Sequence, residues 1–340
     1  MGSFFSKSFD PAADVPDLKG KVVIVTGGNA GVGFATIQHL ARHGAKVYMA
    51  ARNEQKAKAA IERLHADGLG PGNGEVIWLQ LDLSNPRDVK KAAEEFLQKE
   101  QRLDILINNA ALLLLPFQKS HDDIQDIVMV NYIGTFVFTR TLLPLLKKTA
   151  QEPGSDVRII AVNSNANNQC PKDARFRTAD DLNREFADTS FPQFIRYGAV
   201  SPWHHAAYSK MMQLMFIKEL QRKLDAENVP ILCIAVDPGP VNTEGVQAYA
   251  HSVGPILSPI YTLIANLTFA KPTKGAYSTV FAAASPLPRK DVDRYKGAFL
   301  KNPGTHSSAN PLAEKEELRA ELWETTERVL RDLGLEFEAV

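Results

Sequence analysis

The sequence predicts an α/β fold, a doubly wound parallel sheet in a single domain. Short runs rich in Val, Ile and Leu alternate along the chain with longer amphipathic segments. The runs lack the polar alternation of a half-exposed strand, as is typical of strands buried on both faces. The first run, Val22–Val25, leads directly into a glycine turn and a helical pattern that starts at Phe34. This succession of strands and helices favours a parallel sheet with right-handed crossovers.

Each expected element follows from its local pattern. The apolar runs predict six strands, at Lys21–Val25, Lys46–Ala50, Glu75–Leu79, Leu103–Ile107, Arg158–Val162 and Pro230–Val236. Periodic apolar spacing predicts helices between them, at Phe34–His43, Glu54–Ala66, Pro86–Lys99, His121–Lys148 and Ser209–Ala226. Glycines and prolines after these segments mark their ends. A last helix is expected near Leu312–Leu333, after a connection over 286–311.

Sequence patterns and composition indicate how the chain is divided into domains and which partners it is expected to lack. We expect an N-terminal arm over 1–17, one domain over 18–310 with a substrate-loop segment at 245–270, and a C-terminal helix and tail at 311–340 packed on it. Lys plus Arg equals Asp plus Glu, 39 each, so nothing points to a nucleic-acid partner. Cys170 and Cys233 lie in no metal-binding or disulfide pattern, so we expect no metal and a reducing, cytoplasmic setting.

No transmembrane segment is expected. Residues 1–20 lack the apolar core of a secretory signal, and the apolar stretch Ile256–Leu267 is too short and is interrupted by Pro259. The first six residues, Met-Gly-Ser-Phe-Phe-Ser, match a myristoylation pattern. We favour a disordered arm there, and one acyl chain would give only weak peripheral membrane association.

The most informative segment is the glycine turn after the first strand. Glycines let the backbone approach a pyrophosphate, and a helix N-terminus supplies free N–H groups and a partial positive charge. The spacing is G-x-x-x-G-x-G rather than the commoner G-x-G-x-x-G. A tight turn without a ligand is the alternative, but the position ahead of a regular strand–helix alternation favours dinucleotide binding. The candidate cofactor residues in this turn are Gly27, Asn29, Gly31, Val32 and Gly33.

Further motifs follow the later strands in a set order. They are Asp82, Asn108-Asn109-Ala110-Ala111, Asn131 and Arg140 in the next helix, Ser164, and Pro238-Gly239-Pro240-Val241-Asn242-Thr243. With the glycine turn, they resemble the short-chain dehydrogenase/reductase family, and within it the retinol-dehydrogenase-like and fungal reductases. The resemblance covers nearly the whole chain and departs where Ala111 replaces a glycine. It implies a Rossmann fold and hydride transfer between a nicotinamide cofactor and an alcohol or carbonyl carbon.

The resemblance also implies roles for single residues. It assigns the adenine contact to Asp82, a basic position to Arg140, and the nicotinamide side to the loop that carries Pro238, Gly239, Val241 and Thr243; Asn109 and Lys210 complete the implied cofactor set. It assigns the substrate oxygen to Ser164 and a water-linked proton path to Asn131. A lysine, here Lys210, lowers the pKa of the tyrosine that transfers the proton.

The end of the second strand indicates which cofactor binds. A site for NAD needs an acidic residue about 20 positions after the glycines, to accept from the ribose 2′-OH. Here the strand ends Met49-Ala50-Ala51-Arg52-Asn53, without an acid. Arg52 is placed to pair with a 2′-phosphate, which predicts NADP(H). An arginine that only caps a solvated loop is the alternative.

The catalytic tyrosine breaks the family's spacing. The family pattern is Y-x-x-x-K, but Ala206 stands four residues before Lys210, and Tyr208 stands two before it. Removing residues 199–207 would place Tyr197 four before the lysine, which suggests an insertion. Three interpretations stay open: the insert loops out at Pro202 and leaves Tyr197 at the site, Tyr208 reaches in from a shifted helix start, or the usual proton transfer is lost.

The expected activity follows from these motifs. The segment 245–270 is rich in apolar residues and suits a small lipophilic substrate. Its alternative is a helix that packs on its own domain or on a second copy in a homodimer. We expect an NADP(H)-dependent oxidoreductase that interconverts a hydrophobic alcohol and its ketone or aldehyde, in lipid or secondary-metabolite pathways. The alternative is an NADP(H)-binding sensor or scaffold with weak or no redox activity, because the tyrosine–lysine spacing is broken.

Overall fold

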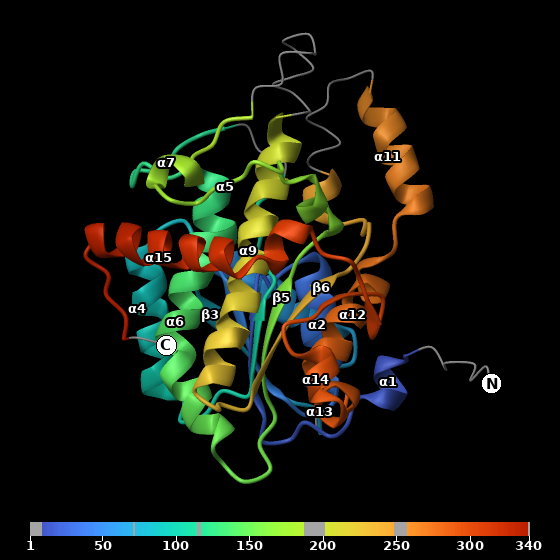
Figure 1. The fold of residues 1–340 in the computed structure, drawn as a ribbon. Helices are drawn as coiled ribbons and strands as arrows, with labels where there is room; N and C mark the ends of the chain where they lie inside the picture. The colour runs from blue at the N-terminus through green and yellow to red at the C-terminus, as the bar shows by residue number, and fades with distance from the viewer. Residues whose placement is uncertain (1–8, 71, 114–116, 187–200, 248–256, 339–340) are drawn as a thin grey trace, which may run out of the picture.

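A sheet of eight strands forms the centre of the described part of the protein (Figure 1). The computed structural model describes residues 9–70, 72–113, 117–186, 201–247 and 257–338. The strand order is β3-β2-β1-β4-β5-β6-β7-β8, parallel except for β8. The strands are β1 Val22–Thr26, β2 Lys46–Ala51, β3 Val76–Gln80, β4 Ile105–Asn108, β5 Val157–Val162, β6 Ile231–Asp237, β7 Phe299–Lys301 and β8 Thr305–His306. The predicted doubly wound α/β fold is confirmed.

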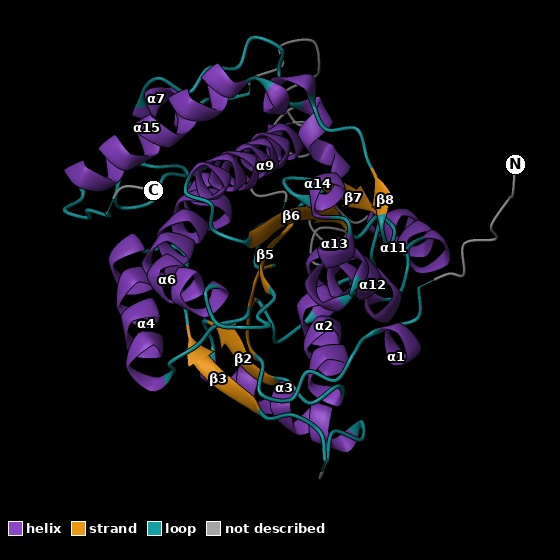
Figure 2. Ribbon diagram, turned by 60° about the horizontal axis from the view of Figure 1, so that its bottom comes forward, coloured by secondary structure: helices purple, strands orange, loops and turns teal. Residues whose placement is uncertain are grey.

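Helices cover both faces of the sheet (Figure 2). On one face lie α2 Gly31–Arg42, α3 Glu54–Ala66 and α12 Pro272–Ala284, and on the other lie α4 Pro86–Lys99, α6 Gly134–Ala150 and α9 Ser201–Ala226. A further helix, α15 Glu316–Asp332, packs on the outside of α9. The described residues also form a further helix, α11 Leu257–Thr268, and short helical turns at α1 Pro11–Asp14, α5 Asp126–Val128, η1 Met129–Ile133, η2 Asn165–Gln169, α7 Ala179–Leu182, α13 Leu287–Lys290, α14 Val292–Tyr295 and η4 Pro311–Glu314.

The strands are buried on both faces, which explains their continuous apolar runs. In β1, Val22 and Ile24 belong to the core beneath α4, α6 and α9. Val23 and Val25 point to the other side and belong to the core beneath α2, α3 and α12. All four side chains are at most 5% exposed. The period of two in a strand therefore divides one apolar run between two cores.

Three elements differ from the sequence prediction. In place of the single expected helix His121–Lys148, the structure has three consecutive elements: α5, the π-helical turn η1 and α6. The connection over 286–311 contains β7 and β8, which are too short for a periodic signal. The described part of helix α9, Ser201–Ala226, already includes eight residues before the predicted start at Ser209.

The helical stretch Asp126–Ala150 is long and apolar enough to cross a bilayer by length and composition alone. Its apolar window is 83% buried inside the protein. The stretch packs against α4 and the sheet, so its hydrophobicity is that of a core helix.

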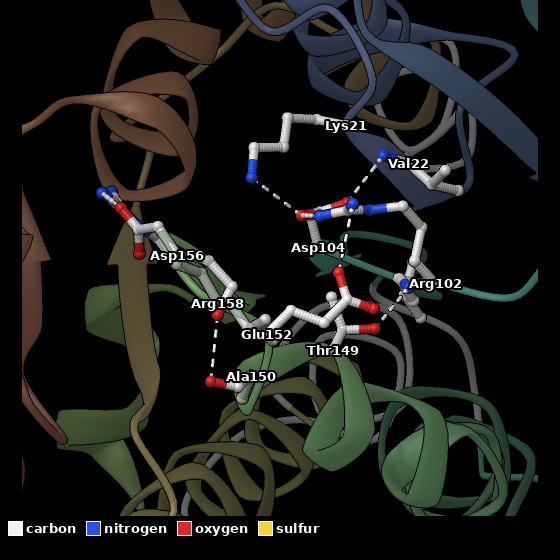
Figure 3. A network of polar contacts seen from close by, with 12 residues as sticks. Lys21, Val22, Arg102, Asp104, Thr149, Ala150, Glu152, Asp156 and Arg158 are labelled. Atoms are coloured by element: carbon white, nitrogen blue, oxygen red, sulfur yellow. Dashed lines mark hydrogen bonds and ion pairs between the residues drawn. The ribbon is translucent and has the colours of Figure 1, made fainter.

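A charged cluster fixes the amino-terminal edge of the sheet (Figure 3). The carboxylate of Asp104, which is fully buried, accepts from Lys21 Nζ at 3.1 Å and from the backbone N–H of Val22 at 3.0 Å. It also accepts two hydrogen bonds from the Arg102 guanidinium, at 2.9 and 2.6 Å. The cluster joins the start of β1 to the start of β4, at the end of the sheet opposite to the glycine turn.

Candidate active site

The predicted site residues follow the carboxyl ends of adjacent parallel strands. The order β3-β2-β1-β4-β5-β6 places the chain reversal between β1 and β4. Ligands of open α/β sheets bind in the crevice at such a switch point. The glycine turn follows β1, Arg52 follows β2, Asp82 follows β3, Asn109 follows β4, Ser164 follows β5 and Pro238 follows β6.

The glycines of the turn are required by close backbone approaches. Gly27 has φ of +63°, and a Cβ there would lie 2.9 Å from the Ala110 Cα. A Cβ on Gly33 would lie 2.5 Å from both Asn109 Nδ2 and the Gly27 carbonyl oxygen. The turn is therefore a backbone cradle at the N-terminus of α2, with the free N–H groups that a pyrophosphate needs. The residues present fit a dinucleotide.

Asn109 holds the turn in place. Its side-chain Nδ2 donates to the carbonyl oxygens of Thr26, at 2.8 Å, and Gly27, at 3.2 Å. The Thr26 hydroxyl oxygen accepts from the backbone N–H groups of Asn109 and Ala110, both at 2.9 Å. Asn109 thus fixes the loop between β1 and α2 through contacts to the backbone.

Arg52 and Asp82 lie side by side beyond the ends of β2 and β3. Arg52 Nε is 3.9 Å from an Asp82 carboxylate oxygen, and the Arg52 side chain is 73% exposed. Asp82 also accepts from the backbone N–H and the hydroxyl of Ser84, at 3.0 and 2.7 Å. Asp82 is therefore oriented by its own turn, while the Arg52 guanidinium remains exposed to a ligand.

The loop after β6 closes on the glycine turn. A Cβ added to Gly31, whose φ is +56°, would lie 3.2 Å from the Thr243 methyl group. Gly239 has φ of +72°, and its N–H donates to Asp237 at 2.8 Å. Val241 is buried, and its backbone forms a parallel bridge with Ala270. Thr243 therefore lies against the turn after β1, and Val241 and Gly239 belong to the same loop.

Ser164 and Lys210 are joined through β5. Lys210 Nζ donates to the carbonyl of Val162 at 2.7 Å and to Gln213 Oε1 at 3.2 Å. Asn163 donates to the Lys210 carbonyl at 2.8 Å, and its side-chain oxygen accepts from the Ser164 N–H at 2.9 Å. The Ser164 hydroxyl oxygen accepts from the Ala166 N–H at 3.2 Å, which leaves its O–H to donate to a substrate.

Burial shifts the proton equilibria at this point of the site. Burial lowers the pKa of Lys210 to about 8, although the nearby Asp237 carboxylate acts in the opposite direction. Burial raises the pKa of Asp237, against hydrogen bonds from the N–H groups of Gly239 and Asn165. A lysine with a pKa near neutrality exchanges a proton readily at physiological pH.

Asn131 lies in the π-helical turn η1, an irregularity that is frequent at functional sites. Its Nδ2 donates to Ser209 Oγ at 2.9 Å and to the Leu112 carbonyl at 3.0 Å, and its Oδ1 accepts from the Leu112 N–H at 2.7 Å. The side chain therefore connects the loop after β4 to the residue beside Lys210. Its amide is committed to protein partners, so it organises the site rather than touching substrate.

Tyr208 does not face Ser164 and Lys210. Its hydroxyl donates to the carbonyl oxygens of Asp181, at 2.9 Å, and Arg175, at 3.2 Å, and its ring stacks on Phe176. Positions two apart on a helix lie on different faces, so Tyr208 cannot share the face of Lys210. The interpretation in which Tyr208 reaches into the site is therefore wrong.

The structure has no loop at Pro202, where the first interpretation places one. Residues from Ser201 onward are helical, and Ala206, one turn before Lys210, is buried at the position that the tyrosine of the Y-x-x-x-K pattern would hold. Tyr197 lies outside the described residues, so its role stays a prediction.

Comparisons with known proteins agree with this arrangement. The family profile of short chain dehydrogenases matches residues 21–173. A short-chain dehydrogenase/reductase of Armillaria gallica is 41% identical over 315 residues, which cover 93% of this chain and 94% of the relative. The human polyprenol dehydrogenase is 32% identical over 324 residues, with 95% and 87% coverage.

The chain belongs to the short-chain dehydrogenase/reductase family. It is therefore an oxidoreductase of CH–OH groups, as the motifs predict. Among solved structures, a Mycobacterium paratuberculosis protein superposes with a TM-score of 0.69 at 25% identity, over 98% of this chain and all of the other. A gluconate 5-dehydrogenase of Beutenbergia cavernae with bound NADP shares the fold, with a TM-score of 0.59 at 18% identity over 85% and 97% of the chains.

One predicted cofactor residue of this short-chain dehydrogenase/reductase lies elsewhere. Arg140 is buried and donates to Glu327 of α15 at 2.8 Å and to the carbonyl of Glu338. Its guanidinium also lies 5.1 Å from the Trp323 ring centroid. The prediction that Arg140 contacts the cofactor is wrong, because this charge is neutralised by the C-terminal helix that covers the face of α6 and α9.

Two residues at the site of this dehydrogenase/reductase, Arg63 and Gln213, were not predicted from the sequence. Arg63 of α3 donates to the Asn29 carbonyl at 3.1 Å and stacks over Phe34 at 4.7 Å, which brings a second cation to the glycine turn. Gln213 accepts from Lys210. Neither position carries a local signal, since an exposed arginine and a glutamine within a helix are ordinary. Within the described residues, no cluster of acidic, His or Cys side chains forms a metal site.

Proposed function

We propose that this protein is an NADP(H)-dependent oxidoreductase that interconverts a small hydrophobic alcohol and its ketone or aldehyde. The observation that supports NADP(H) most directly is Arg52, an exposed guanidinium next to Asp82 after a strand that ends without an acid. A 2′-phosphate would gain charge-assisted, bidentate hydrogen bonds from Arg52. Arg63 brings a second cation to the glycine turn, where it donates to the Asn29 carbonyl. Related folds of Burkholderia cenocepacia and Escherichia coli are solved with NADP and NADPH.

The roles of the chain's own residues follow from their positions. The bound nicotinamide supplies or accepts the hydride. Ser164 would donate its O–H to the substrate oxygen and orient the reacting carbon. Lys210 would give a proton to that oxygen in reduction and take it back in oxidation, because its ammonium has a third N–H beyond those bound to Val162 and Gln213. In this proposal Lys210 transfers the proton itself, since Ala206 supplies no hydroxyl.

The proposed substrate is lipophilic. Helix α11 follows the loop at Val241–Thr243 and consists almost wholly of apolar and uncharged residues. The human relative is named for polyprenol, a long hydrophobic alcohol, and fungal relatives come from Armillaria and Colletotrichum. We place the reaction in lipid or secondary metabolism, in a reducing cytoplasmic setting that suits two buried free cysteines, Cys170 and Cys233.

The test is steady-state turnover with both cofactors on a panel of ketones and aldehydes of rising chain length. We expect a lower KM for NADPH than for NADH, and kcat/KM that rises as apolar carbons are added. Fluorescence of bound NADPH measures binding separately. Tight binding without turnover of any carbonyl or alcohol would overturn the proposal in favour of a sensor, and a preference for NADH would overturn the role of Arg52.

A further inference from the structure

Helix α11, Leu257–Thr268, is held to the protein along one side. Ala265 is fully buried. The next residue, Asn266, accepts from Asn242 Nδ2 at 2.7 Å and from Gln247 Nε2 at 3.3 Å. These contacts attach the helix to the loop after β6 that borders the site. Figure 1 shows α11 standing at the side of the fold, beyond the helices that cover the sheet.

The opposite side of α11 presents aliphatic side chains to solvent. Leu263, Ile264 and Leu267 are 59%, 50% and 76% exposed. At 100° per residue they lie on one stripe, which faces away from Ala265. These are three of the six most exposed large hydrophobic residues in the described part of the chain. Grouped exposure of this kind marks an interaction surface, whereas single exposed leucines need no explanation.

Charge and position indicate what covers this stripe. Helix α11 has no charged residue, and the two lysines that follow it, Lys271 and Lys274, are exposed and take part in none of the ion pairs of the described residues. Two further exposed apolar residues lie at the same carboxyl edge of the sheet: Leu113, next to Gly245, and Trp203, at the start of α9. An aliphatic stripe with lysines at its end, on an edge of the fold that also carries an exposed tryptophan, matches the chemistry of a bilayer interface.

We propose that α11 docks on the surface of a lipid bilayer, with Leu263, Ile264 and Leu267 in the acyl boundary and Lys271 and Lys274 at the headgroups. Its twelve residues span about 18 Å, too little to cross the hydrocarbon core, so the helix lies in the interface. Because Asn266 of α11 is hydrogen-bonded to the loop after β6, docking of α11 brings that loop close to the membrane. The inference concerns the surface alone and holds whichever carbonyl the enzyme reduces.

Flotation of the full chain, made without any acyl group, on two kinds of vesicle tests the proposal. One kind is phosphatidylcholine alone, and the other contains phosphatidylserine as well. We expect binding to both, and tighter binding to the anionic vesicles because of the two lysines. Leu267→Glu and Leu263→Glu should each weaken binding at least tenfold. K271E/K274E should remove the preference for phosphatidylserine and leave the binding to neutral vesicles.

Leu287→Glu is the matched control, since Leu287 is 53% exposed on α13, at the opposite end of the molecule (Figure 1). It should bind vesicles as the wild type does. Cofactor fluorescence of every variant checks folding, and it reports on the proposed activity separately from the surface. Absence of wild-type flotation, equal binding by Leu267→Glu, or a wild-type dimer that Leu267→Glu dissociates would each overturn the proposal, the last in favour of a second copy of the chain.

Discussion

Gln213 lies one helical turn after Lys210 in α9, and its side-chain oxygen is 3.2 Å from Lys210 Nζ. Gln213 is fully buried, and the same oxygen also accepts from Asn163 at 3.2 Å, while its Nε2 has no partner. Burying an amide group without a hydrogen bond lowers the stability of the fold. The unpaired Nε2 of Gln213 therefore has a stability cost, while its oxygen holds Lys210 in place. Gln213 is therefore a positioning residue for Lys210, the group that we propose transfers the proton.

Substitution of Gln213 should move the pKa of Lys210. Gln213→Leu removes an acceptor of the charged form and should lower that pKa by about one unit, the equivalent of one hydrogen bond to a charged group. Gln213→Glu should raise it. The pH profile of kcat measures both shifts. Gln221→Leu, a buried glutamine of α9 that binds the backbone at Ile231 and Cys233, should lower stability and leave the profile unchanged.

The pH dependence of the wild type follows from Lys210. Burial lowers its pKa to about 8, so the protonated form that donates in reduction is lost as the pH rises through about 8. Carbonyl reduction should therefore slow above that pH, and alcohol oxidation should accelerate. The arginine in Lys210→Arg stays protonated throughout, so the decrease in carbonyl reduction above a pH of about 8 should disappear from the pH profile. A decrease that persists in the arginine variant would assign the titration to another group.

Arg52 should decide between the two cofactors. Arg52→Glu replaces the guanidinium with a carboxylate that repels a 2′-phosphate and accepts from a ribose hydroxyl. The KM for NADPH should rise by about tenfold or more, since a charged hydrogen bond contributes roughly 1.5–3 kcal/mol. The KM for NADH should fall. Lys58→Glu, an exposed reversal on α3, is the control and should change neither value.

Tyr208 should matter for stability rather than for turnover. Its hydroxyl bonds the carbonyls of Arg175 and Asp181, so Tyr208→Phe should cost about 1–2 kcal/mol of unfolding free energy and leave kcat nearly intact. Thermal or urea unfolding and turnover measure the two effects. Tyr197→Phe should also keep turnover if Lys210 transfers the proton. Loss of turnover with NADPH binding retained would instead make Tyr197 the acid.

The Asp104 cluster should contribute to stability alone. Asp104→Asn leaves Lys21 and Arg102 without their buried anion, and we expect a loss of about 2–3 kcal/mol in urea unfolding. The KM for the cofactor should not change, because the cluster lies at the amino-terminal edge of the sheet (Figure 3). Asp293→Asn breaks an exposed pair with Lys296 and should leave the urea midpoint nearly unchanged, because solvent screens such a pair.

Local patterns were sufficient for much of the fold. The six strands that cross the core carry continuous apolar runs, and each ends in a residue or motif with chemistry of its own. β7 and β8 could not be found this way, because strands of three and two residues have no period to detect. The start of α9 was misplaced for a related reason, since Pro202 is as typical of a first helical turn as of a loop.

The sequence alone determined the glycine turn, the order of the strands along the chain and the family, because these depend on residues that are neighbours in the chain. Only the tertiary structure decided which side chains reach the site. Arg140 and Tyr208 are chemically suited to it, but each is bound to a segment far away in the chain: Arg140 to Glu327 and Tyr208 to Asp181. Arg63 and Gln213 are brought to the site by helix packing. Long-range packing decides such contacts, and it leaves no local pattern.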